Sequence, residues 1–147
     1  MNDWQPTVSN VMSTQLYTVS PYSTIKDAYD LLMDHDLRAL PVVGDEGELV
    51  GIISERDIIR YRTRNILPKH ADFYIKVQDV MTSSVNSFQP GLPLGEAAKK
   101  FVKWGNNQVP VVEDEVVVGI VEHIDLLSFF SDQWDSSANQ MEGANIT

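Results

Sequence analysis

Two stretches of the chain carry apolar side chains at the 3.6-residue spacing that is typical of an amphipathic helix. They cover residues 25–33 and 94–102. Thr24, followed three residues later by Asp27, resembles a capping box at the start of the first stretch. The pattern therefore predicts a helix in each half of the chain. The apolar positions are Ile25, Ala28, Tyr29, Leu32 and Met33 in the first stretch and Leu94, Ala97, Ala98, Phe101 and Val102 in the second.

Each predicted helix is followed by two short apolar runs with a polar turn between them. Runs of this length, rich in valine and isoleucine and joined by a turn, predict a β-hairpin. A further helix is expected to start at Ser54, and its counterpart starts near Glu122. The runs cover residues 40–43 and 49–53 in the first half, and residues 109–112 and 116–121 in the second.

The two halves are copies of one unit. Residues 8–13 return as residues 77–82, and Asp57 returns as Asp125, with every matched segment in the same order. Each copy reads as β-α-β-β-α, so we predict an α/β (α+β) fold of two tandem units packed with pseudo-twofold symmetry, because one such unit cannot cover its own sheet. The expected organisation is repeat 1 over residues 8–60, a linker over 61–76, repeat 2 over 77–130 and a disordered tail over 131–147.

Composition and charge narrow the possible functions. Cysteine is absent, which excludes disulfides, thiolate metal sites and a cysteine nucleophile. The net charge of −10 argues against non-specific binding of nucleic acid. No segment resembles a secretory signal or a membrane span, so we expect a soluble cytoplasmic protein. Six of the eleven basic residues fall between positions 56 and 76, either as a solvated linker face or as a positive strip near an anionic ligand.

The repeated motifs together resemble the CBS domain, named after cystathionine beta-synthase. The resemblance covers residues 8 to about 130. It implies a sensor module that binds AMP, ADP, ATP or S-adenosylmethionine in composite clefts between the two repeats, and that often stacks into a disc-shaped homodimer. The matching pieces are residues 10–13 and 79–82 at the unit starts, residues 38–43 at the central strand and residues 51–57 at the end.

The first cleft centres on the segment Ser54-Glu55-Arg56-Asp57. A helix start offers free N–H groups to an anion, a carboxylate one turn in can accept bonds from a ribose diol, and an arginine can pair with phosphate. The same spacing also reads as a simple capping box with a solvated arginine, and the two roles are compatible. The resemblance implies that the second repeat completes this cleft with Ser84, Val85 and Asn86 near the adenine and with Asn107 and Gln108 near the sugar or phosphate.

The second cleft departs from this pattern. Asp125 retains the ribose carboxylate, but Glu122 stands at the serine position and Ile124 at the arginine position. A glutamate there would repel a phosphate. Arg38 either pairs with Glu122 or a ligand anion or is an exposed strand charge, and His123 is a candidate ligand contact. We predict a weaker second site from Arg38, Glu122, His123 and Asp125, empty or holding a less charged adenosine compound.

Catalytic signatures are missing from the sequence. The three histidines show no metal-ligand spacing, and no glycine-rich phosphate loop or nucleophile with its base is visible. We therefore expect a non-enzymatic, homodimeric sensor with no metal and no required cofactor, which signals to a separate effector protein. The alternative is a ligand-free scaffold for dimerisation and interaction. Met12 and Met81 are interpreted as core-filling side chains.

Overall fold

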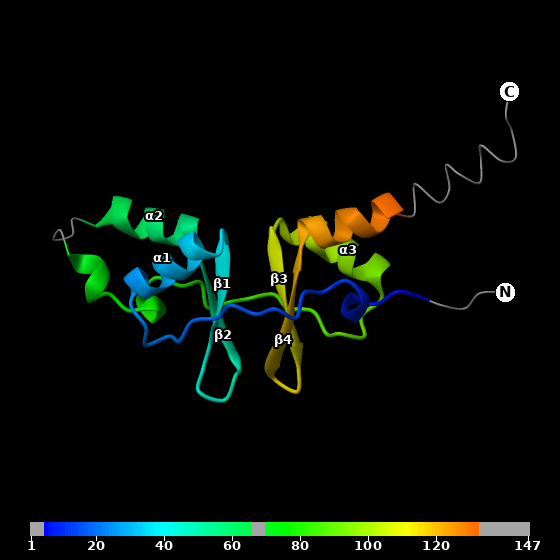
Figure 1. The fold of residues 1–147 in the computed structure, drawn as a ribbon, viewed down its shortest axis with the longest axis horizontal. Coiled ribbons are helices and arrows are strands. Elements are labelled where there is room, and N and C mark those ends of the chain that lie inside the picture. Colours follow the sequence, from blue (N-terminus) through cyan, green and yellow to red (C-terminus); the bar gives the residue numbers. More distant parts are fainter. Residues whose placement is uncertain (1–4, 66–69, 133–147) are drawn as a thin grey trace, which may run out of the picture.

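The computed structural model describes residues 5–65 and 70–132, so most of the predicted tail lies outside the described residues. It confirms a mixed helix and strand fold in which each half contributes a helix, an antiparallel hairpin and a second helix (Figure 1). The elements are η1 (Val8–Asn10), α1 (Ile25–Asp34), β1 (Ala39–Val43), β2 (Leu49–Ser54), α2 (Glu55–Arg64), η2 (Ala71–Phe73), η3 (Val77–Asp79), α3 (Leu94–Trp104), β3 (Gln108–Glu113) and β4 (Val116–Glu122), and residues 123–132 are helical.

The strands form two separate two-stranded sheets, β1 with β2 and β3 with β4. The hairpins lie side by side at the centre of the molecule, with the helices beside them (Figure 1). The predicted first strand of each repeat is reduced to one parallel bridge, between Val19 and Val42 and between Phe88 and Val111. A proline two residues further along each segment cannot donate a backbone hydrogen bond, which limits the pairing there.

Helix α1 starts as the sequence predicts. Thr24 Oγ1 accepts a hydrogen bond from Asp27 N at 3.2 Å, and Asp27 Oδ2 accepts one from Thr24 N at 3.1 Å. This reciprocal pair is the expected capping box. It satisfies two backbone donors that an isolated helix start leaves free.

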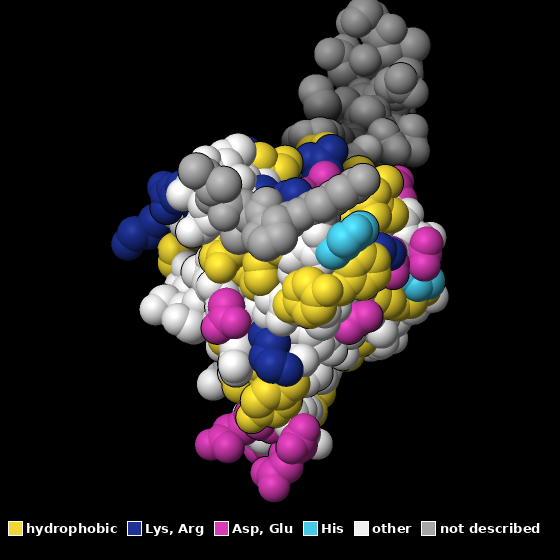
Figure 2. Space-filling model, turned by 90° about the vertical axis from the view of Figure 1, so that its left-hand side faces the viewer, with side chains coloured by type: hydrophobic (Ala, Val, Ile, Leu, Met, Phe, Trp, Pro, Cys, Tyr) yellow, Lys and Arg dark blue, Asp and Glu magenta, His cyan; other side chains and the backbone are white. Residues whose placement is uncertain are grey.

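The buried stripe of the helices is narrower than their apolar pattern predicts. Tyr29 and Met33 are 48% and 61% exposed, and Val102 on α3 is 81% exposed. A two-stranded hairpin offers a helix only a narrow apolar surface, so the outer positions of the stripe stay in solvent. Figure 2 shows hydrophobic side chains among charged ones on the face at the α1 and α2 end of the molecule.

The leading segments of the two repeats are exchanged. Val8 N donates to Leu92 O at 3.0 Å, whereas Val77 N donates to Ser23 O at 2.7 Å. Each leading segment thus packs in the other half of the molecule, and Figure 1 shows the two connections crossing at the centre. Thr82, from the second of these segments, is thereby placed beside β2 of the first half.

Two hydrophobic clusters result, one in each half. Met81 packs against the first cluster and Met12 against the second, which confirms their predicted role as core filling. Leu40 and Ile53 are fully buried in the first, and Phe88 is nearly so in the second. The first cluster contains Val19, Ile25, Ala28, Leu32, Leu40, Val42, Ile53 and Val77, and the second contains Val8, Phe88, Leu94, Ala97, Phe101, Val109, Val111, Val121 and Leu126.

Candidate functional site

The start of α2 brings a serine and a buried carboxylate together. Ser54 Oγ accepts a hydrogen bond from Asp57 N at 3.1 Å, and Asp57 Oδ2 accepts one from Ser54 N at 2.9 Å. The capping box considered for this segment is therefore present. It holds the Asp57 side chain in one orientation and occupies only one of its two oxygens.

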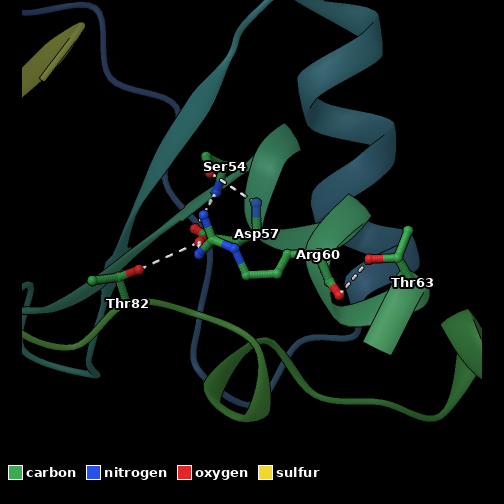
Figure 3. Close-up of polar contacts among 5 residues, drawn as sticks. All are labelled: Ser54, Asp57, Arg60, Thr63 and Thr82. Carbon is green, nitrogen blue, oxygen red and sulfur yellow. Dashed lines mark hydrogen bonds and ion pairs between the residues drawn. The ribbon is translucent and has the colours of Figure 1, made fainter. Parts of the chain in front are cut away.

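The second oxygen of the Asp57 carboxylate faces two groups from different parts of the fold. Asp57 Oδ1 lies 3.4 Å from Thr82 Oγ1, which donates a hydrogen bond, and 3.7 Å from Arg60 Nη1 (Figure 3). Asp57 is only 9% exposed, while the Arg60 side chain is 48% exposed. A carboxylate so far removed from water needs compensation, and Arg60 is the cation that supplies it.

A cavity of about 300 Å³ opens in front of this carboxylate. Its walls come from both repeats, and its volume lies at the lower end of the range for small-molecule sites. Ala39, Ile52 and Val85 are its apolar wall residues, and most of the others carry hydroxyl, amide or charged groups. The cavity is lined by Arg38, Ala39, Ile52, Ser54, Asp57, Arg60, Thr82, Ser84, Val85, Asn86, Asn106, Asn107 and Gln108.

A wider, more open cavity of about 650 Å³ adjoins the first and shares four lining residues with it. Arg38 and Arg56 both line this adjoining cavity, and Glu55 is the one lining residue of opposite charge. The composite site therefore has a carboxylate within it and two guanidinium groups toward the outside. Such an arrangement suits a ligand with hydroxyl donors at one point and an anionic group at another.

Most of the residues predicted for the first cleft lie on the first cavity. Ser54, Asp57, Ser84, Val85, Asn86, Asn107 and Gln108 all line it, whereas Arg56 lines the adjoining space. Arg38, which the sequence analysis assigns to the second cleft, lines both of these cavities and not the small one beside Glu122. The reason is local, because the Arg38 carbonyl accepts a hydrogen bond from Glu55 N at 3.0 Å and ties this residue to the start of α2.

The second cleft is much smaller. The cavity beside Glu122 has a volume of about 30 Å³, enough for a water molecule but far below the volume of small-molecule sites. Asp125 Oδ2 accepts a hydrogen bond from Glu122 N at 2.7 Å and so caps the helix of residues 123–132. His123 is exposed, and its backbone N donates to Asn107 O at 3.2 Å.

Three polar residues of the cavity escaped the sequence analysis, and one of them, Asn106, directly precedes the predicted Asn107. Arg60 lies one turn after Asp57 on α2, and Thr82 comes from the exchanged segment at the start of the second repeat. Thr82 has a visible counterpart in Ser13, so the repeat itself carries a signal for it. Arg60 has none, because Ser128 stands at the matching position.

Clustered metal ligands and membrane-spanning helices are both absent from the described residues. Within residues 5–65 and 70–132, no group of three or more histidine, aspartate or glutamate side chains is placed to hold a metal ion. The helices in the same part of the chain are all too short or too polar to cross a membrane.

Comparisons with known proteins agree with the repeated architecture. The CBS domain family model matches twice, over residues 8–64 and 77–132. The CBS domain-containing protein YhcV of Bacillus subtilis is 34% identical over 81% of this chain and 81% of its own length. Three other curated relatives are longer proteins, of which this chain covers 14% to 47%.

Two similar solved structures contain adenosine compounds. CBSX2 of Arabidopsis thaliana in complex with AMP is 27% identical, covers 86% of this chain and 96% of its own, and has a TM-score of 0.75. The CBS domain pair of protein MJ0100, in complex with 5′-methylthioadenosine and S-adenosyl-L-methionine, is 29% identical with a TM-score of 0.72, covering 88% of this chain and 98% of its own. The two family matches together span most of the chain, which belongs to the CBS domain family.

Proposed function

We propose that this protein is a regulatory module that binds an adenine nucleotide, AMP, ADP or ATP, in the cavity between its repeats. The observation that carries the proposal is the position of Asp57, a buried carboxylate with one oxygen turned toward the cavity. Arg38 and Arg56 stand where the same space opens outward. A nucleotide combines neutral hydroxyl donors with a strongly anionic group, as this arrangement of groups requires.

Each part of the nucleotide has a matching wall. The ribose diol would donate to Asp57 Oδ1, as hydroxyl groups donate to an ionised carboxylate. The phosphates would lie toward Arg38 and Arg56, near the first turn of α2, where the helix dipole favours negative charge. The adenine would pack among the apolar wall residues Ala39, Ile52 and Val85. Its ring nitrogens and amino group would form hydrogen bonds with the amides of Asn86 and Asn107 or with nearby backbone groups. The AMP complex of CBSX2 and the adenosine compounds bound to MJ0100 support this class of ligand.

The second cleft should bind such ligands weakly or not at all. Its cavity of about 30 Å³ lacks room for a nucleoside. Ile124 replaces the arginine at the entrance, and Glu122 adds a negative charge where a phosphate would lie. The module is therefore proposed to hold one nucleotide per chain.

We further propose that the module acts as a homodimer and without catalysis, transmitting occupancy to a separate effector protein. Ile59 and Leu127 occupy matching positions in the two repeats and are 62% and 50% exposed. Large apolar side chains repeated on one helical layer are typical of an association surface. A nucleotide that contacts both repeats would favour one relative orientation of them and could change this surface by its differential affinity.

Thermal denaturation with AMP, ADP, ATP and S-adenosylmethionine, with and without Mg²⁺, tests the proposal directly. A ligand at 100 times its Kd should stabilise the protein by about 2.7 kcal/mol. Asp57→Asn keeps an oxygen that can cap α2 and removes the charge, so calorimetry should show AMP affinity reduced by about 10- to 100-fold. The matched change Asp125→Asn should leave AMP affinity unaltered. A flat thermal response at millimolar ligand, or an Asp125→Asn variant that alone loses AMP, would refute the assignment.

A further inference from the structure

The Asp57 carboxylate, which is proposed to bind the ribose, already forms an ion pair with Arg60. Asp57 Oδ2 is used by the backbone of Ser54, so Oδ1 is the oxygen that faces the cavity. Arg60 Nη1 lies 3.7 Å from that same oxygen. Figure 3 shows the Arg60 side chain folded back along the first turn of α2, with its guanidinium group against the Asp57 carboxylate. A ligand diol would have to approach the atom that Arg60 now contacts.

Arg60 also lies between two cavities. It lines the cavity of about 300 Å³ and a third cavity of about 440 Å³, called the outer cavity from here on, which is separate from the space lined by Arg56. Asp57 and Thr82 line both the first cavity and the outer cavity. The outer cavity is bordered by Arg64 and Asn65 toward the end of α2. Because the Arg60 side chain is long and half exposed, its guanidinium group can move into the outer cavity without disturbing the core.

This arrangement is confined to the first repeat. Both repeats keep the carboxylate, as Asp57 and Asp125, but Ser128 occupies the position that matches Arg60. A serine can neither neutralise the carboxylate nor reach across its helix turn as an arginine does. The ion pair is thus a feature of the cavity that has room for a ligand.

We propose that Arg60 is an internal competitor for the ribose-binding carboxylate, which a diol-bearing ligand displaces into the outer cavity. The inference rests on the proposed function, because it takes Asp57 as the diol acceptor. Arg60 then lowers the affinity for every ligand that carries the diol, by the strength of its ion pair with Asp57. It also makes the exposed face of α2 differ between the empty and the occupied protein, since the guanidinium group changes sides on binding.

Calorimetry with adenosine and with 2′,3′-dideoxyadenosine tests this competition. Arg60→Met keeps most of the side-chain length and removes the charge. Because ion pairs of this kind contribute about 0.2–1 kcal/mol, Arg60→Met should tighten adenosine binding by about 1.4- to 5-fold. The affinity for 2′,3′-dideoxyadenosine, which lacks both hydroxyl groups, should stay unchanged. Lys99→Met, which removes one positive charge from an exposed position of α3 that lines neither cavity, should alter neither affinity and controls for net charge.

Three results would overturn the inference, and they separate it from the proposed function. If Arg60→Met weakens AMP binding and leaves adenosine unaffected, Arg60 contacts the phosphate and does not compete with the ribose. If AMP binds and Arg60→Met tightens adenosine and its dideoxy analogue equally, the diol is not what Arg60 displaces. If neither the original protein nor the variant binds adenosine or AMP, the proposed function fails together with this inference.

Discussion

Gly51 lies where the leading segment of the second repeat packs tightly against β2. An added Cβ at this position would stand 2.5 Å from Met81 Sδ and 2.9 Å from the backbone oxygen of Thr82. The methionine side chain can turn away, but the oxygen is held in place. Ile52 and Thr82 exchange two backbone hydrogen bonds, each of 2.9 Å, directly beside it. Gly51→Ala should therefore push the leading segment of the second repeat off β2.

The size of this effect follows from two contributions. Forcing a methyl group into a well-packed interior costs about 1–3 kcal/mol. Weakening the two hydrogen bonds between Ile52 and Thr82 adds about 0.5–1.5 kcal/mol for each bond that is lost. We expect Gly51→Ala to lower the free energy of unfolding by about 2–4 kcal/mol, which corresponds to a fall in Tm of roughly 4–16 °C for a chain of this length.

Urea unfolding followed by circular dichroism measures this change, and the chain contains a matched control. Gly95 lies on α3, and no described atom is within 4 Å of a Cβ added there. Alanine favours a helix over glycine by about 0.5–1 kcal/mol in the interior, and Gly95 lies in the first turn, so Gly95→Ala should raise the free energy of unfolding by less than this. The two glycine-to-alanine changes are thus expected to have opposite signs.

A second variant shows whether the Thr82 oxygen or the Met81 sulfur causes the clash with the added methyl group. If the clash is with the Thr82 oxygen, adding Met81→Ala to Gly51→Ala should not restore stability. The second substitution removes only the sulfur contact, and it also removes a side chain that packs against the core. Recovery of the original stability in the double variant would show that the sulfur alone was in the way. A Gly51→Ala protein within 0.5 kcal/mol of the original would refute the close approach itself, since surface substitutions produce changes of about that size.

Two further predictions concern α1, which lies outside the nucleotide cavity. Thr24→Ala removes the side-chain half of the capping box and should cost about 0.5–2 kcal/mol in urea unfolding, with AMP affinity as the unaffected control. The pKa of Lys26 is raised above its ordinary value of 10.5, chiefly by its hydrogen bond to Asp30. The stability that this pair contributes is present below pH 10.5 and is lost as the pH rises through the raised pKa. NMR titration of Lys26 in an Asp30→Asn variant should show the pKa falling back, and an unchanged pKa would rule out Asp30 as the cause.

Local features of this fold could be predicted because they depend on fixed spacings in the sequence. The capping boxes at Thr24 and Ser54 need only a hydroxyl and a carboxylate three residues apart, and both form. The hairpins follow from apolar runs joined by a short turn. The choice of the cavity residues from the second repeat depended on the resemblance to the CBS domain, which implies that one copy's helix start faces the other copy's strands, and these residues do line the cavity.

Side-chain reach and strand juxtaposition could not be predicted in the same way. Arg60 enters the cavity only because its side chain folds back along α2, and a sequence pattern does not specify that rotamer. Arg38 lines the first cavity because the Glu55 N hydrogen bond ties it to the start of α2, at the point where the starts of β1 and β3 also meet, with Gln108 Nε2 donating to Ala39 O at 3.4 Å. The exchange of the leading segments leaves no trace in one sequence, since residues 8–13 and 77–82 carry the same apolar motif and fit either core.

The two repeats show that a retained carboxylate is not by itself evidence of a retained ligand site. Asp57 accepts a hydrogen bond from Ser54 N at 2.9 Å, and Asp125 accepts one from Glu122 N at 2.7 Å, so both cap a helix. This structural role is enough to keep an aspartate at each position. The two clefts differ first in volume, about 300 Å³ against about 30 Å³, and second in charge, because three arginines of the first repeat have uncharged counterparts in the second repeat. The matched pairs are Arg38 with Asn107, Arg56 with Ile124 and Arg60 with Ser128. The duplicated frame thus repeats the helix-capping carboxylate, while the proposal of a nucleotide site in the first copy alone rests on the larger cavity and on Arg38 and Arg56 beside it.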